Sequence, residues 1–141
     1  MAVFSIDKTK MVEIRENPFK LEKELHDLVE KNLDVIFGLE YIQSELSIQN
    51  FRFDTLAWDP DRKAFAIIEF KRGKNESVID QGIAYYTISL RYKSDLVLAL
   101  HEKYGPNKVK KEEINWDQTR ILFISASFNA YQRTFLNIKL P

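Results

Sequence analysis

Apolar residues recur at helical spacing in several parts of the chain. Between residues 19 and 37 they are separated by charged residues, which predicts an amphipathic helix that ends at Gly38. The same period predicts a helix over residues 77–91. A shorter helix is expected over residues 96–104, capped by Ser94-Asp95. A strand is the alternative there, because periodicity does not settle a short apolar run.

Four other segments have the composition of β-strands. Residues 41–46, 51–58 and 64–70 are rich in aromatic and aliphatic residues, and their short connections favour an antiparallel arrangement. Residues 120–126 are expected to form a buried strand, followed by a closing helix over residues 129–138. The order αβββαβ therefore predicts an α/β fold with α+β character, in which a mixed sheet of about four strands is flanked by helices.

The composition is that of an ordinary globular protein. The 141 residues are enough for one domain, so residues 1–141 are expected to form a single unit, with residues 1–18 as an N-terminal extension. No apolar run approaches the roughly 20 residues that cross a membrane. The chain has no cysteine, and its N-terminus lacks the features of a secretory signal, so a cytoplasmic location without membrane partners is expected.

The charges are balanced, because Lys and Arg together number 21 and so do Asp and Glu. No global positive field attracts the chain to nucleic acid, and binding would depend on local basic clusters. The absence of cysteine excludes zinc sites built on thiolates.

The most informative stretch is the apolar run from Ala64 to Phe70, because a glutamate and a lysine lie at its end. Side chains alternate along a strand, so Glu69 and Lys71 are expected to point the same way. This spacing alone proves little, since Asp61-Arg62-Lys63 repeats it within a turn. An ordinary ion pair is the alternative to a metal-and-water site.

Asp54 adds a second carboxylate in the preceding strand. If the two strands pair, Asp54 and Glu69 can converge, and two such carboxylates repel unless a cation lies between them. Oxygen ligands suit magnesium or manganese, and a metal with Lys71 nearby supplies what phosphodiester hydrolysis requires. Gln81 and Tyr85, four positions apart on the next helix, could face the same site or merely edge the core.

These motifs, in order Phe53-Asp54, Ile68 to Arg72 and Val78 to Tyr86, resemble the PD-(D/E)XK nuclease superfamily, which has a restriction-endonuclease-like core. The resemblance extends over residues 21–131 and is closest to a branch related to the NucS-type endonuclease domain. Phe53 stands where the superfamily's name has proline.

The resemblance implies a Mg²⁺-dependent endodeoxyribonuclease, with Mn²⁺ as a substitute. Asp54 and Glu69 would be metal ligands together with the backbone carbonyl of Phe70, and Lys71 would be the catalytic lysine. Gln81 and Tyr85 would be the supporting pair. A glutamate from the first helix often completes the site, and Glu22 is chosen over Glu30 because it borders the apolar stripe, whereas Glu30 is expected nearly opposite.

The expected partner is DNA, contacted by Arg52, Arg72 and Lys74. A homodimer would provide two active sites for two antiparallel strands. The alternative is a catalytically silent module with the nuclease fold that binds nucleic acid or a protein. A structural or transport-associated protein is disfavoured, because it leaves the carboxylates in apolar strands without a reason.

Overall fold

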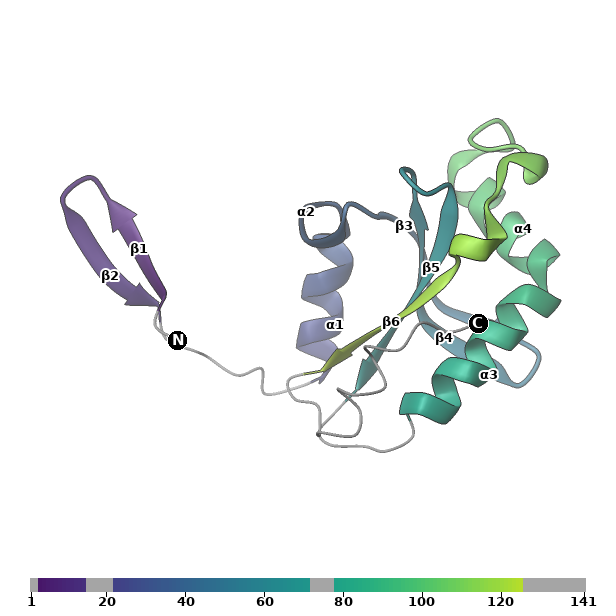
Figure 1. Ribbon diagram of the computed structural model, residues 1–141, viewed down its shortest axis with the longest axis horizontal. Helices are drawn as coiled ribbons and strands as arrows, with labels where there is room; N and C mark the ends of the chain where they lie inside the picture. Colours follow the sequence, from purple (N-terminus) through teal and green to yellow (C-terminus); the bar gives the residue numbers. More distant parts are fainter. Residues whose placement is uncertain (1–2, 15–21, 72–77, 126–141) are drawn as a thin grey trace.

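The computed structural model describes residues 3–14, 22–71 and 78–125 (Figure 1). Within the extension expected over residues 1–18, strands β1 (Val3–Asp7) and β2 (Lys10–Ile14) pair as an antiparallel hairpin, which was not among the predicted elements. Lys8 has a φ of 51° in the connecting turn, which is the left-handed conformation that tight hairpins require.

The central sheet has the strand order β3-β4-β5-β6. Its strands are β3 (Glu40–Ile48), β4 (Phe51–Asp59), β5 (Ala64–Lys71) and β6 (Arg120–Ser125). The first three are antiparallel and joined by short turns, whereas β6 is parallel to β5 and is reached by a helical crossover. The predicted four-stranded mixed sheet flanked by helices is confirmed.

The first predicted helix is divided in two, α1 (Glu22–Lys31) and α2 (Leu33–Phe37). Asn32 separates them, and its Nδ2 donates a hydrogen bond to the carbonyl of Leu28 at 2.8 Å, which satisfies an acceptor in the last turn of α1. The expectation of one continuous helix is therefore wrong. Its predicted stop is confirmed, because Gly38 has a φ of 68° and closes α2.

Two helices form the crossover, α3 (Val78–Arg91) and α4 (Lys93–Tyr104). The alternative of a strand within residues 95–100 is wrong, because that run buries one helical face against the sheet. Capping by Ser94-Asp95 is also wrong, since α4 begins after Tyr92 without a side-chain cap. Two 3₁₀ turns, η1 (Lys111–Glu113) and η2 (Trp116–Gln118), lead to β6. The helix expected over residues 129–138 lies outside the described residues.

The sheet lies between two helical layers, with α1 and α2 on one face and α3 and α4 on the other (Figure 1). Each face has its own apolar core. Leu56, Phe65 and Ile67 pack toward α3 and α4, whereas Ala66 and Ile68 pack toward α1 and α2. Strand β5 is thus buried on both faces, which explains its unbroken apolar sequence. No helix in the described ranges has the length and apolarity needed to cross a membrane.

Asp59 links the turn after β4 to the start of β6, at the end of the sheet opposite to Glu69. Its Oδ1 accepts the backbone N–H groups of Asp61 and Arg62, and its Oδ2 accepts from the side chains of Arg62 at 2.9 Å and Arg120 at 3.1 Å. Burial alone would raise the pKa of this carboxyl, but the hydrogen bonds and charges of the two arginines lower it overall. The same turn contains Asp61 and Lys63, which repeat the spacing of Glu69 and Lys71.

Candidate active site

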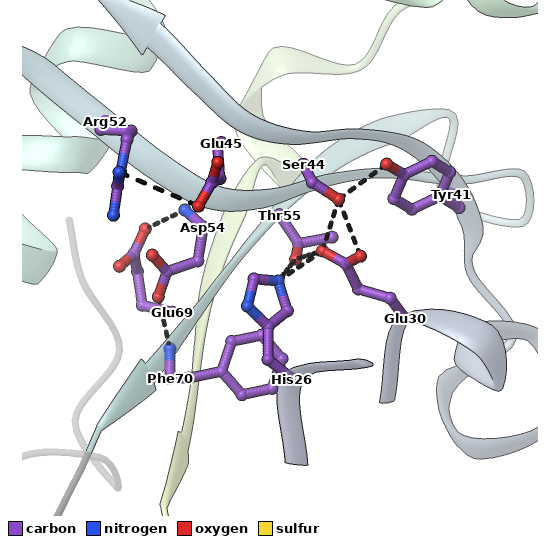
Figure 2. A network of polar contacts seen from close by, with 10 residues as sticks. All are labelled: His26, Glu30, Tyr41, Ser44, Glu45, Arg52, Asp54, Thr55, Glu69 and Phe70. Carbon is purple, nitrogen blue, oxygen red and sulfur yellow. Dashed lines mark hydrogen bonds and ion pairs between the residues drawn. The ribbon is translucent and has the colours of Figure 1, made fainter. Parts of the chain in front are cut away.

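The candidate site lies where the pairing of β4 and β5 ends. The last paired residues are Thr55 and Ile68, so Asp54 and Glu69 are opposite each other one step further on. The backbone N–H of Asp54 donates to Glu69 Oε1 at 2.9 Å, and the backbone N–H of Phe70 donates to Asp54 Oδ2 at 2.9 Å (Figure 2). Side-chain carboxylates thus replace backbone carbonyls as acceptors, and this brings the two predicted acids together.

Strand β4 is irregular at this point. Phe53 and Leu56 belong to the same apolar cluster although they are three positions apart, so strict alternation of side chains is interrupted between them. In the neighbouring strand β3, Glu45 has a φ of 53°, an uncommon value for a residue other than glycine. Asp54 is two positions from Leu56 and follows the regular register with β5, so the irregularity affects Phe53 rather than Asp54.

Glu69 is only 2% exposed, and its electrostatic environment is unfavourable for a negative charge. Its pKa is raised from 4.5 to about 8, chiefly by burial and in addition by the charge of Asp54, against the lowering effects of the Asp54 N–H and of Lys71. Lys71 is the half-buried last residue of β5, two positions beyond Glu69. Its charge is outweighed, so a cation between the two carboxylates would be strongly favoured.

The predicted supporting pair on α3 does face the site. Gln81 Nε2 lies 3.4 Å from Glu69 Oε2 and donates to Tyr85 Oη at 2.9 Å, and Tyr85 Oη donates to the carbonyl of Arg52 at 3.0 Å. Tyr85 also contacts the ring of Phe53 at a centroid distance of 5.0 Å. Within the described part of the chain, Gln81 Oε1 is buried without a hydrogen-bond partner. A buried acceptor of this kind needs a donor from a water or ligand.

Helix α1 contributes His26, which the sequence pattern did not single out, and Glu30, over which Glu22 was preferred. Glu30, expected nearly opposite the apolar stripe, instead faces the sheet and accepts a hydrogen bond from Thr55 Oγ1 at 2.5 Å, and His26 Nε2 lies at the same distance from Glu30 Oε1. The expectation was wrong because Glu22 and Glu30 are eight positions apart, which is about 80° around a helix rather than 180°. The i, i+4 spacing of His26 and Glu30 was the available signal.

The remaining predicted residues are placed only in part. Glu22 begins α1, but its side chain lies outside the described set, and its role stays a prediction. The side chain of Arg52 is 61% exposed, and its Nη1 lies 3.9 Å from Oε1 of the exposed Glu45. Arg72 and Lys74 fall outside the described residues.

The donor set can be compared with what a metal ion needs. Among the described residues, no group of three or more His, Cys, Asp or Glu side chains is placed to hold a metal. Asp54 and Glu69 form a pair of hard oxygen donors, to which the Phe70 carbonyl and water can add. Mg²⁺ is commonly bound through one or two carboxylates and several waters, so the pair fits this ion without a third acid.

The comparisons with known proteins concern the sequence and the fold. No family model matches the sequence. An uncharacterised protein of Haemophilus influenzae is 41% identical over 139 residues, which is 99% of this chain and 46% of the relative. The chain therefore spans about half the length of that protein.

Solved structures of repair endonucleases share the fold. A repair endonuclease from Pyrococcus abyssi aligns with 89% of this chain and 46% of its own at a TM-score of 0.52 and 23% identity. EndoMS in complex with double-stranded DNA aligns with 96% of this chain and 60% of its own at a TM-score of 0.53 and 18% identity. The mixed α/β fold of this chain is thus similar to that of repair endonucleases.

Proposed function

We propose that this chain is a metal-dependent nuclease domain of the PD-(D/E)XK type, which hydrolyses phosphodiester bonds of DNA. The observation that carries the proposal is that the two carboxylates meet at the end of the β4 and β5 pairing, where the Asp54 N–H donates to Glu69 Oε1 and the Phe70 N–H donates to Asp54 Oδ2. The similarity to repair endonuclease folds supports it, because one of those structures contains double-stranded DNA.

In this proposal Asp54, Glu69 and the carbonyl oxygen of Phe70 hold a magnesium or manganese ion. When bound, such an ion polarises the scissile phosphate and lowers the pKa of a coordinated water. The raised pKa of Glu69 supports this assignment, since the cation would replace the proton that the buried carboxyl otherwise retains.

Lys71 follows two positions after Glu69, and its ammonium group would orient the attacking water and offset the charge that develops on the phosphate. The water releases a proton as its oxygen bonds to phosphorus, one P–O ester bond breaks, and the leaving oxygen takes up a proton, so no net proton is gained or lost. Gln81 holds Glu69 from α3, and its Oε1, which has no hydrogen-bond partner among the described residues, can accept a hydrogen bond from water or from a nucleotide. Tyr85 fixes Gln81 in turn. Arg52, Arg72 and Lys74 are the proposed contacts to the DNA backbone.

The test is cleavage of plasmid, single-stranded and branched DNA with magnesium or manganese. Lys71→Ala and Glu69→Ala are expected to reduce the rate by about 100-fold or more. Lys63→Ala is the matched control, because Lys63 has the same spacing from an acid but lies exposed in a turn, and its rate is expected to equal the wild-type rate.

Calorimetry of metal binding distinguishes an active nuclease from a catalytically silent module with the same fold. A wild-type protein that binds manganese at the carboxylate pair and cuts DNA supports the enzyme. Cleavage that survives both Lys71→Ala and Glu69→Ala would contradict the mechanism, and a wild-type protein that binds DNA without binding metal would identify a silent module.

A further inference from the structure

A connected set of polar side chains lies between α1 and the sheet, next to the two carboxylates (Figure 2). Glu30 is at its centre. Ser44 Oγ lies 2.8 and 2.7 Å from the two carboxylate oxygens of Glu30, and Thr55 Oγ1 donates to Glu30 Oε1 at 2.5 Å. His26 Nε2 lies 2.5 Å from the same oxygen and 3.1 Å from Thr55 Oγ1. Both oxygens of Glu30 are therefore engaged by protein groups.

Packing alone does not explain why Glu30 and His26 lie here, because burying these polar side chains costs free energy. The side chains of Glu30 and His26 are only 15% and 19% exposed, so Glu30 loses much of its hydration on folding. The same helix already packs on the sheet through Val29, and Leu33 of α2 adds to that apolar contact. An apolar residue at position 30 would bury surface without desolvating a charge, so the polar set points to a requirement for fixed geometry rather than for stability.

The set reaches the candidate site at two points. Thr55 is the neighbour of Asp54 in β4 and belongs to the last backbone pair before the strands separate. Phe70 is the neighbour of Glu69 in β5, and its N–H holds Asp54 Oδ2. The His26 ring stacks on the Phe70 ring, with centroids 4.4 Å apart and an interplanar angle of 26°.

At the site each of the two strands keeps backbone pairing on its outer edge only, β4 with β3 and β5 with β6. Beyond Thr55 the regular pairing of β4 with β5 stops, so between these two strands Asp54 and Phe70 are held by contacts of side chains. His26 and Glu30 supply such contacts from the α1 face, since they hold Thr55 by hydrogen bonds and Phe70 by stacking. A metal site tolerates little displacement of its ligands, because outer contacts orient the inner ones.

We infer that His26 and Glu30 are positioning residues of the candidate site, which hold Thr55 and Phe70 and thereby set the position of the Asp54 carboxylate and the Phe70 carbonyl for metal binding. This inference rests on the proposed function, because it specifies how the same metal site is kept in shape. Neither side chain contacts the metal or the DNA in this scheme.

The experiment measures manganese affinity by calorimetry and DNA cleavage at saturating metal for Glu30→Gln and His26→Phe. Glu30→Gln keeps the shape and one acceptor but removes the charge, and His26→Phe keeps the ring on Phe70 but removes the Nε2 contacts. Each is expected to weaken manganese binding by about 10- to 100-fold, the usual effect of losing an outer contact of a metal site. At saturating manganese, KM for DNA is expected to stay at the wild-type value.

Two controls separate positioning from general loss of stability. Tyr41→Phe removes the hydroxyl that contacts Ser44 at 2.7 Å, at the far end of the set, and is expected to keep wild-type metal affinity. Leu100→Ala creates a cavity in the other apolar core and destabilises the fold by about 2–5 kcal/mol without touching α1. It is also expected to bind manganese as the wild type does.

The outcomes distinguish the inference from the proposed function. Wild-type manganese affinity in both Glu30→Gln and His26→Phe would overturn the positioning role while leaving the nuclease proposal standing. Equal weakening in Leu100→Ala would also overturn it, because the effect would then follow stability alone. A wild-type protein that binds no manganese would overturn the proposed function and this inference together.

Discussion

Replacing Glu69 by glutamine is expected to change the pH dependence of stability of the metal-free protein. The carboxyl of Glu69 has a pKa of about 8 in the folded chain, against 4.5 as its ordinary value, because it is buried beside Asp54. Below pH 4.5 it carries a proton in both the folded and the unfolded states. Between pH 4.5 and 8 the unfolded chain releases that proton and the folded chain retains it, so stability falls as the pH rises.

The size of the effect follows from the difference between the two pKa values. That difference is 3.5 units, and at 1.36 kcal/mol per unit the free energy of unfolding falls by about 5 kcal/mol as an upper limit. Glutamine does not titrate, but it weakens the hydrogen bonds with the Asp54 N–H and Gln81 by about 1–2 kcal/mol. Glu69→Gln is therefore expected to be about 3 kcal/mol more stable than the wild type at pH 8 and about 1 kcal/mol less stable at pH 5.

Urea unfolding at pH 5, 6, 7 and 8 in the presence of a chelator measures this crossing. Glu24→Gln is the control, because Glu24 is an exposed glutamate of α1, and its curve is expected to run parallel to the wild-type curve. A constant difference between Glu69→Gln and the wild type at every pH would refute the reasoning. Under the proposed function, magnesium at pH 8 restores stability to the wild type and leaves Glu69→Gln unchanged.

Two further predictions concern the frame of the sheet. Asp59→Ala removes the carboxylate that the half-buried Arg120 and the more exposed Arg62 share, so a loss of about 3 kcal/mol is expected by urea unfolding. Because the pKa of Asp59 is lowered below 3.8, the wild type loses this advantage as the pH falls through the folded pKa. A difference that persists undiminished in acid would contradict the assignment. Gly82→Val is expected to destabilise the fold by about 1–3 kcal/mol, because a Cβ at Gly82 would lie 3.2 Å from the Phe123 ring. Combining Gly82→Val with Phe123→Leu is expected to recover part of this loss. Purely additive effects of the two substitutions would argue against the contact.

The sequence alone determined the strands of the sheet and the acids at its end. Alternation and short connections identify β3, β4 and β5, because strand pairing between neighbours depends on local patterns that a single chain displays. Glu69 and Lys71 follow from the same period of two. That Asp54 would be opposite Glu69 needed the register of β4 with β5, which is set by the turn between the two strands.

Only the tertiary structure decided which residues surround that pair. Asn32 divides the first helix, and the docking of α1 on the sheet brings Glu30 to Thr55, 25 positions away. The choice between helix and strand over residues 95–100 likewise depended on what that run packs against. Helical spacing shows which side chains share a face. The partner of that face is set by the packing of whole elements, which the sequence period does not reveal.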